Sequence, residues 1–330
     1  MAEYLTNTAD LTAVADAIRA KGGTSAQLIY PSGFVSAIQA IQTGIKPKLV
    51  VTTTPGAAIT ATPAEGFKVV KGTAGADGMC TLELPKAGTW HVTAMANSVS
   101  NSQNIVIGTQ NMLLPLYHDT FANNTWEEII AVCRTGIAPD SWAVGDSKTM
   151  NIGGTAYQVD IIGKNHDEYA DGSGTAPLTF QLHDCYSEAK QMYDTNLSGL
   201  GWKNTDMRLT YLPAILALMP AEVKNGIHAV NKKTSKGGNS TTIETVSDTL
   251  FLLSEVEVFG TNRSSVPGEG IQYDYYKAGN PKIKKREGVD EFWWERSSAS
   301  GGMFCRVRDN GQAGASNASN SFGVSFAFCF

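Results

Sequence analysis

The sequence lacks the local motifs of the common enzyme classes. It contains no HExxH zinc motif, no GxSxG nucleophile motif, no phosphate-binding P-loop and no Gly-rich dinucleotide fingerprint after a strand. Its five cysteines are widely spaced without a CxxC pair, which excludes a zinc framework and a disulfide scaffold. We therefore expect no enzyme, no metal and no cofactor.

Long apolar runs are also missing. No run approaches the roughly 20 residues that cross a membrane, and no basic segment precedes an apolar stretch as in a signal peptide. We therefore expect synthesis in a cytoplasm, no signal peptide and no membrane insertion. A protein of this kind that acts outside a cell would leave by lysis or on a particle.

Charged residues are scarce at 17%, and the net charge of −5 lacks the basic excess of a nucleic-acid-binding protein. One basic cluster could form a local patch, but a solvated loop is the simpler interpretation: Lys282, Lys284, Lys285 and Arg286. Hydrophobic content of 42% is sufficient for a core, and 33 glycines with many Ser, Thr and Asn favour β-rich, loop-rich domains.

Residues 1–45 are predicted to form a helical segment. Apolar residues recur at i, i+3, i+4 and i+7, on one helical face: Leu11, Val14, Ala15 and Ile18. Gly22 is expected to end this helix, and a second short helix is predicted after Pro31. Since two short helices cannot bury a core alone, we expect them to join other copies or a larger assembly. Packing against the rest of the chain is the alternative.

Residues 46–112 predict a small all-β domain. Six short runs rich in β-branched and aromatic residues are separated by turn clusters, a pattern typical of a β-sandwich. Within one run, Trp90, Val92 and Ala94 alternate with polar residues and predict one buried face. The segment resembles the bacterial Ig-like modules that serve as spacers in surface and phage tail proteins.

Residues 113–330 predict the largest domain, of the α+β class. Asn124 and Thr125 precede the amphipathic run WEEIIAVC, which indicates a capped helix. Gly153 and Gly154 lie between two alternating runs, which is a strong hairpin signal. Because predicted strands and helices are segregated rather than alternating, the class is α+β.

The sequence predicts the secondary structure of three further segments of this domain. Residues 178–184 (LTFQLHD) and 249–260 (TLFLLSEVEVFG) are predicted strands. Residues 207–220 predict a helix that is interrupted near Pro213. His166, Asp167, Glu168 and Asp171 share a polar loop, but it lacks EF-hand spacing, so a solvated turn is favoured over a calcium site.

The order of motifs along residues 115–330 resembles a known fold family. The motifs are WEEI, the Gly-Gly hairpin, DMR, LFLLSEVEVFG, GEGIQYDYY, FWW with R and S, FC with V, and a terminal GV with AFCF. Together they resemble the C-type-lectin-like domain of bacterial and phage proteins. The same fold carries hypervariable proteins that retroelements diversify, and it is related to the formylglycine-generating enzyme.

The opening segment, LTNTADLTAVADAIRAKGGTSAQLIYPSGFVSAIQAI, resembles one common in phage tail and baseplate-associated proteins. The resemblance thus implies an attachment segment (1–45), an Ig-like spacer (46–112) and a lectin-like tip (113–330). It implies a receptor-binding protein on a virion tail or a prophage-derived particle, with a bacterial surface protein or glycan as partner. Residues 1–45 would contact other tail proteins and form a homo-oligomer, with a trimer favoured.

Two other interpretations stay open. One is a structural tail or baseplate component without a ligand. The other is a surface glycan-active enzyme, because a catalytic carboxylate pair has no local signature. The related oxidase needs two closely spaced cysteines, whereas Cys305 and Cys329 lie far apart, which disfavours an oxidase. A disulfide between these two cysteines is an alternative to two free, buried thiols.

The candidate ligand surface lies in residues 292–330. Aromatic and apolar anchors at both ends enclose small and polar residues, as in scaffolds that display a binding surface. Trp293 and Trp294 are interpreted as core rather than as a sugar-stacking platform, and an unspecialised polar loop is the alternative for the rest. The predicted ligand-binding residues are Glu295, Ser297, Ser298, Ala299, Ser300, Met303, Arg306, Arg308, Asn310, Gln312, Ala315, Asn317, Asn320, Phe322, Ser325 and Phe326.

Some of these positions depart from the family pattern. The family often ends in Gly-Val-Arg-Pro-Ala-Phe, where this chain has Ser325 and Phe326 in place of Arg and Pro. Glu295 stands where the family usually has an apolar residue. Diversification by a retroelement acts on adenines, and between Ser297 and Phe322 most residues are reachable from Asn codons. The departures therefore indicate either diversified positions or ordinary drift.

Overall fold

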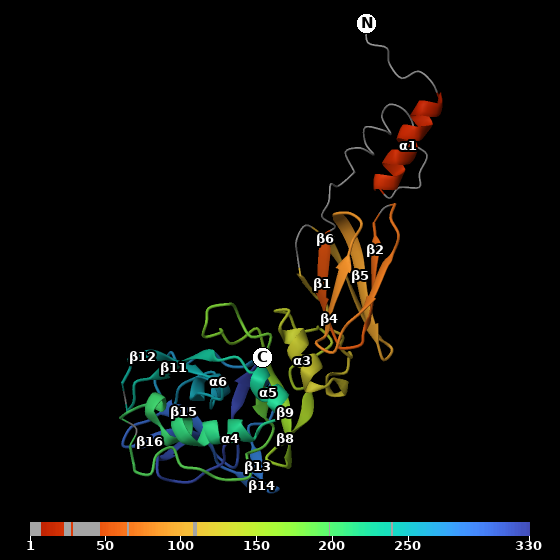
Figure 1. Ribbon diagram of the computed structural model, residues 1–330. Helices are drawn as coiled ribbons and strands as arrows, with labels where there is room; N and C mark the ends of the chain where they lie inside the picture. The colour runs from red at the N-terminus through yellow and green to blue at the C-terminus, as the bar shows by residue number, and fades with distance from the viewer. Residues whose placement is uncertain are drawn as a thin grey trace. The chain divides into compact units, whose positions relative to one another are not determined.

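The computed structural model describes residues 8–22, 28, 47–64, 66–107, 111–197, 199–238 and 240–330. The chain is mixed α+β, with mostly sheet and few helices, as predicted (Figure 1). It divides into two compact parts, which we call the N-terminal unit (Met1–Tyr117) and the C-terminal unit (His118–Phe330). Within the described residues, no helix has both the length and the apolar character to span a membrane.

The predicted first helix is present as α1 (Thr8–Gly22) and ends at the expected glycine. Ala15 and Ile18 are its buried residues, and they pack with Leu11 and Leu28. Val14, predicted on the same face, is exposed instead. The second predicted helix, after Pro31, lies outside the described residues.

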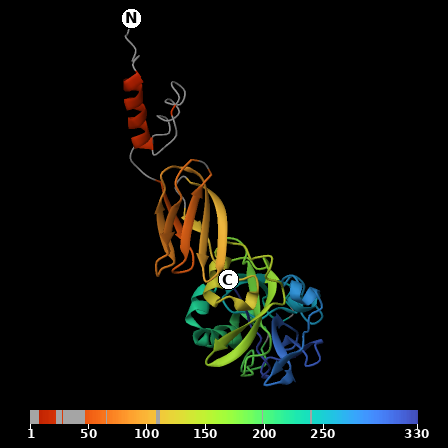
Figure 2. The same ribbon diagram turned by 90° about the vertical axis from the view of Figure 1, so that its right-hand side faces the viewer.

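Two sheets follow in the N-terminal unit, and their strands run roughly along a common direction (Figure 2). One sheet has the order β4-β1-β7 and the other β3-β2-β5-β6. All six predicted runs form strands, and a seventh, β7, pairs in parallel with β1. The strands are β1 (Lys48–Thr52), β2 (Ala58–Pro63), β3 (Val70–Thr73), β4 (Met79–Glu83), β5 (Gly88–Ala96), β6 (Val99–Ile107) and β7 (Asn111–Leu113).

A single apolar core joins these two sheets. Trp90, Val92 and Ala94 of β5 are buried as the alternation predicts, and they share the core with residues of β1 and β4. Leu114 and Leu116 belong to the same core. The packing of this unit therefore continues beyond residue 112, where the sequence pattern placed the end of the all-β segment.

The main sheet of the C-terminal unit has the order β18-β10-β9-β8, with β8 (Ser147–Ile152), β9 (Thr155–Lys164), β10 (Leu178–Leu182) and β18 (Ala327–Cys329). Gly153 and Gly154 join β8 to β9 at φ values of 57° and 87°, which glycine adopts without strain, so the predicted hairpin is confirmed. The predicted helix is α3 (Trp126–Cys133), and Thr125 forms its capping box with Glu128.

Three smaller sheets and several short helices complete this unit. The three-stranded sheet is β15 (Trp293–Ser298), β16 (Met303–Val307) and β17 (Ala313–Asn317). The two hairpins are β11 (Val230–Ser235) with β12 (Ile243–Asp248), and β13 (Lys284–Arg286) with β14 (Val289–Glu291). The helical segments are η1 (Phe121–Asn123), η2 (Trp202–Asn204), the π-helical turn η3 (Met207–Tyr211), α4 (Leu212–Leu218), α5 (Ala221–Gly226), α6 (Glu255–Phe259) and α7 (Asp274–Lys277).

The predicted strand 249–260 is wrong, because its second half forms helix α6. Ser254 accepts a hydrogen bond from the backbone of Glu257, and the Glu257 side chain accepts one from the backbone of Ser254. Gly260 ends the helix in the left-handed conformation, at φ 75°. Only Phe251 keeps a strand-like contact, a bridge to Ala327.

The structure contradicts the expectation for Lys284 and decides between the two alternatives for Cys305 and Cys329. Lys284 is not solvated: it is buried, and its Nζ donates to the carbonyls of Leu182 (2.6 Å) and His183 (2.8 Å). Burial lowers the pKa of Lys284 to about 8. All five cysteines are free and buried, so Cys305 and Cys329 form no disulfide.

Candidate functional site

The structure places six of the predicted ligand-binding residues in the interior, and we remove them from the site. They are Glu295, Ser297, Ser298, Ala299, Ser325 and Phe326. Every residue of β15 is buried, because the strand is covered on both faces instead of exposing one to solvent. The two tryptophans at its start, Trp293 and Trp294, belong to the core, as predicted.

The other ten predicted residues keep some exposure, and most lie at two opposite ends of the β16–β17 hairpin. One end is the connecting turn, residues 308–312, in which Gly311 has φ 80°. The other end joins the start of β16 to the residues after β17. Arg308, Asn310 and Gln312 belong to the first end; Ser300, Met303, Asn317 and Asn320 belong to the second.

Arg306 lies near the first end, on the sheet face that it shares with Trp294 and Gly314, its partners in register. Its guanidinium carbon is 4.2 Å from the ring centroid of Phe292 and 5.3 Å from that of Phe322. These distances are those of cation–π contacts. The predicted residues Arg306 and Phe322 are therefore brought together, whereas Ala315 is separated from them in the middle of β17.

The hydrogen bonding of Arg306 is incomplete. Its Nε donates to Ser316 Oγ at 2.6 Å, but Nη1 is buried without a hydrogen-bond partner among the described residues. Burial, and then the neighbouring Arg308, lower the pKa of Arg306. Asp309 acts in the opposite direction, but it forms no ion pair with Arg306, so this guanidinium has lost water without gaining a paired carboxylate among the described residues.

Gly314 allows the two arginines to converge. A Cβ atom at this position would lie 2.9 Å from Arg308 Nε and 3.7 Å from Arg306 Cζ. The first distance is too short for a real contact. Any side chain at position 314 would therefore displace Arg308 from its place beside Arg306.

The aromatic residues around Arg306 are held firmly. Phe322 packs on Trp294 and Phe292 with ring centroids 4.8 Å and 5.4 Å apart. Trp294 Nε1 donates to the carbonyl of Lys190 at 2.8 Å, and Lys190 pairs with Phe322 in an isolated bridge. Because Trp294 is buried, this packing gives Arg306 a rigid support.

A buried ion network holds β15 against the rest of the unit. Arg296 binds the Glu257 carboxylate with Nη1 and Nη2, and it also donates to the carbonyls of Leu252 and Glu269. Lys232 lies 2.8 Å from Glu257. No local spacing pattern in the sequence indicates this network, because its members come from β11, α6 and β15.

Asp167 completes the network from the loop that the sequence suggested as a solvated turn. It is buried, 2.6 Å from Lys232 Nζ, and accepts from Thr179 and Tyr273. Burial alone would raise the pKa of Asp167, but the Lys232 ammonium outweighs it and lowers the pKa to about 2. Among the described residues, no group of three or more His, Cys, Asp and Glu is arranged to hold a metal ion.

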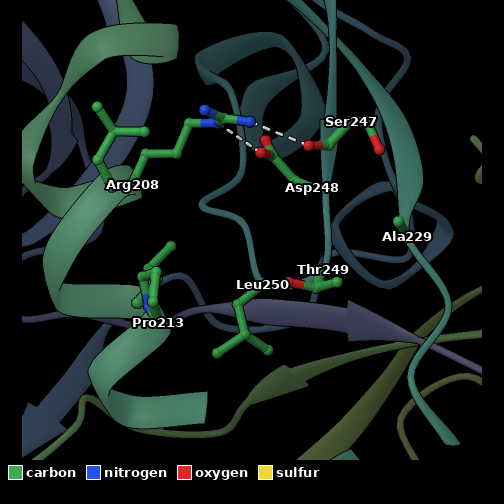
Figure 3. A pocket seen from close by; sticks show the side chains of 9 residues that line it. Arg208, Pro213, Ala229, Ser247, Asp248, Thr249 and Leu250 are labelled. Carbon is green, nitrogen blue, oxygen red and sulfur yellow. Dashed lines mark hydrogen bonds and ion pairs between the residues drawn. The ribbon is translucent and has the colours of Figure 1, made fainter. Parts of the chain in front are cut away.

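A second feature, a cavity of about 290 Å³, lies between η3–α4 and the end of β12. Figure 3 shows Arg208 and Asp248 along one side of the space and Pro213 and Leu250 along the other. Arg208 Nε donates to Asp248 Oδ1 at 2.6 Å, and its Nη2 donates to the Ser247 carbonyl at 3.0 Å. Sequence reasoning did not find this pocket.

The local sequence explains the π-helical turn beside this pocket. Pro213 has no N–H to donate within the helix, and the chain widens just before it. The N–H of Leu212 consequently bonds to the carbonyl of Met207, five residues earlier. The predicted interruption of the helix near Pro213 is thus present, and it sets Arg208 at the rim of the pocket.

Comparison with known families covers the part of the chain that contains both features. Residues 179–330 are similar to the family described as Domain of unknown function (DUF6273). Comparisons with curated proteins and with solved structures gave no match. The Arg306 face and the Arg208 pocket both fall inside the matched segment.

Proposed function

We propose that this protein is a receptor-binding component of a phage tail or a prophage-derived particle. Its C-terminal unit, which we take to have a C-type-lectin-like fold, attaches to a bacterial surface protein or glycan. The N-terminal unit acts as an Ig-like spacer, and residues 1–45 join other tail proteins and other copies, with a homotrimer favoured. The motif order described above supports this assignment.

The observation that carries the proposal is the presentation of Arg306 and the 308–312 turn. Arg306 rests on the half-buried rings of Phe292 and Phe322, and Phe322 packs on the buried Trp294. The side chains beside it on the turn are exposed: Arg308, Asn310 and Gln312. A recognition site needs rigid anchors and adaptable polar contacts, and this arrangement has both. Several copies on one particle would strengthen weak individual contacts through avidity.

Binding of the full chain to bacterial envelopes tests the proposal. Labelled protein is incubated with envelopes from a panel of bacteria, and bound protein is measured after washing. We expect wild-type protein to bind the envelopes of a subset of strains, and Arg306→Gln to weaken that binding. Arg134→Gln, which removes the same charge from an exposed site elsewhere in the unit, is the matched control. Absence of binding to every envelope would overturn the proposal.

Sequencing the gene across a natural population tests whether a retroelement diversifies it. We expect variation at the exposed codons, such as those of Arg308, Asn310 and Asn317, at adenine-derived positions. The buried positions, Glu295 and Ser297 among them, should stay constant, because a new side chain there has no room. Even variation over both classes would contradict diversification.

One observation favours the structural tail component as a second candidate. Leu209 and Leu218 on η3 and α4 are 55% and 52% exposed, and no charged residue lies between them in the sequence. An exposed apolar helix face is typical of a surface that packs against a neighbour. Leu218→Lys would impair particle assembly under this alternative and leave envelope binding unchanged under the first.

A further inference from the structure

We propose that Arg306 and Arg308 form an oxyanion-binding subsite, and that the ligand of the C-terminal unit is a saccharide carrying a carboxylate or a phosphate. This inference rests on the proposed function, because it names the chemistry of the ligand that the same face would bind. It adds a charge requirement that neither the motif order nor the family match contains.

The charge pairing of the arginines in this unit singles out Arg306. The three other arginines that are not exposed each bind a carboxylate: Arg208 with Asp248, Arg286 with Glu291, and Arg296 with Glu257. Arg306 is half-buried as well, yet it forms no ion pair among the described residues: Asp309 favours its charged form but lies beyond ion-pair distance. A charge withdrawn from water without a partner is unfavourable, so a ligand oxyanion would stabilise this site.

Arg308 adds a second unpaired positive charge beside Arg306. Its side chain is exposed, lies over Gly314 beside Arg306, and makes no hydrogen bond or ion pair to a described residue. Both guanidinium groups lie beside Gly314 and repel each other, and an anion between them removes that repulsion. Because the Arg308 side chain has no hydrogen bond or ion pair to a described residue, it can turn toward an anion that binds beside Arg306.

The surroundings favour a saccharide as the carrier of the charge. Phe322 is half-exposed next to Arg306, and its exposed ring surface can pack against the apolar face of a sugar. Asn310 and Gln312 are exposed on the adjoining turn and supply amide donors and acceptors for hydroxyl groups. Guanidinium groups bind carboxylate and phosphate in the same fork geometry, so both sources remain within one chemistry.

Nuclear magnetic resonance of the full chain with labelled arginine side chains tests the subsite. The probes are glucuronate, glycerol 1-phosphate and neutral glucose at millimolar concentration. We expect the Arg306 Nε–H signal to shift with one or both anions and not with glucose, and the response to weaken with added salt. A shift with glucuronate alone assigns a carboxylate, and a shift with glycerol 1-phosphate alone assigns a phosphate. An equal shift with glucose, or none with either anion, would overturn the inference.

Variants distinguish a loss of anion binding from a loss of folding. Arg308→Gln alters only an exposed side chain, so the fold is kept, and we expect the affinity for the anion to fall about tenfold, as for one lost charge-assisted hydrogen bond. Arg134→Gln should leave the affinity unchanged. If wild-type protein and Arg308→Gln bind envelopes equally well, the anion inference fails while the proposed function stands. If wild-type protein binds anions but no envelope, the proposed function fails instead.

Discussion

The two units are stabilised by different means. In the described part of the N-terminal unit, Thr53 is the one buried polar residue, and the core is otherwise apolar. Its ion pairs, Lys48–Glu83 and Arg19–Asp16, have exposed or half-exposed side chains. The C-terminal unit instead buries many ionisable groups: Asp160, Asp167, Lys232, Asp248, Glu255, Glu257, Glu269, Lys284, Glu295 and Arg296.

Apolar packing and buried ion pairs differ in how strictly they fix the strands and helices that they join. Apolar contacts are non-directional and tolerate small shifts, which suits a spacer. Buried ion pairs are directional, and each member strongly depends on its partner. The network of Lys232, Glu257 and Arg296 therefore fixes β11, α6 and β15 in one arrangement, and β15 lies next to the strand that carries Arg306.

The largest effect is expected from removing one charge of the network. Lys232→Met leaves Asp167 buried without its cation, and we expect a loss of about 3–5 kcal/mol of unfolding free energy in the C-terminal unit. Hydrogen exchange followed by mass spectrometry reports each unit separately in the full chain. Faster exchange of peptides from β15 and β16, with unchanged exchange in β5, is the predicted result. Equal stability of the variant would show that the ion network is not needed.

Acid should act on the C-terminal unit through Asp167. Its pKa of about 2 lies below the ordinary value of 3.8, so its contribution is present above pH 3.8 and is lost as the pH falls toward 2. The shift corresponds to about 2 kcal/mol. Hydrogen exchange between pH 5 and pH 2, corrected for the intrinsic rate, should show this loss in β10 and β11. A loss of the same size in Lys232→Met would contradict the assignment to this pair.

Unlike Lys232, Glu295 is a buried ionisable residue whose replacement is expected to stabilise the C-terminal unit. Neither of its carboxyl oxygens has a hydrogen-bond partner among the described residues, and burial, then Glu255 and Glu269, raise its pKa well above 4.5. We expect Glu295→Leu to stabilise the C-terminal unit by roughly 1–2 kcal/mol at pH 7. Because the folded protein keeps a proton that the unfolded chain releases above pH 4.5, the gain should grow as the pH rises. Urea unfolding of variant and wild type at two pH values measures it, and a destabilised variant would refute it.

The smallest effect is expected from the N-terminal unit. Lys48→Met removes a pair whose side chains are 63% and 57% exposed, and such pairs contribute less than about 1 kcal/mol. Hydrogen exchange of β1 and β4 should change little, and added salt should reduce what difference there is. A loss as large as that of Lys232→Met would remove the distinction between the two units.

Local signals in the sequence predicted much of the fold. The Thr125 capping box, the Gly153–Gly154 hairpin and the alternation around Val92 each depend on neighbouring residues, and each is present. The segment 249–260 failed because its apolar residues and valines favour a strand, while the Ser254–Glu257 capping box starts a helix in the middle of it. The capping signal was in the sequence and should have outweighed the propensity.

The candidate site was less predictable, because its surroundings are distant in sequence. Both faces of β15 are covered, and the backbone N–H of Arg296 donates to Leu253, which lies far upstream. Glu295 was included because it departs from the family pattern, and no local signal indicated that both faces of its strand are covered. The partners Asp167 and Lys232 are 65 residues apart, and no spacing rule brings them together. Arg306, in contrast, was predicted from a local signal: Arg306 and Arg308 alternate with Val307, which on a strand directs both away from the core.

The pairing of β10 with β18 has a consequence for how the chain reaches its native state. Thr179 and Cys329 are strand partners although 150 positions separate them, whereas β5 and β6 join through a tight turn. Closing so long a loop is slow, and until it closes one edge of β10 stays open to pairing with other chains. We expect two phases in stopped-flow refolding, the slower from the C-terminal unit, with aggregation that rises with protein concentration during that phase. The yield of folded protein would then be limited by the rate at which β10 pairs with β18.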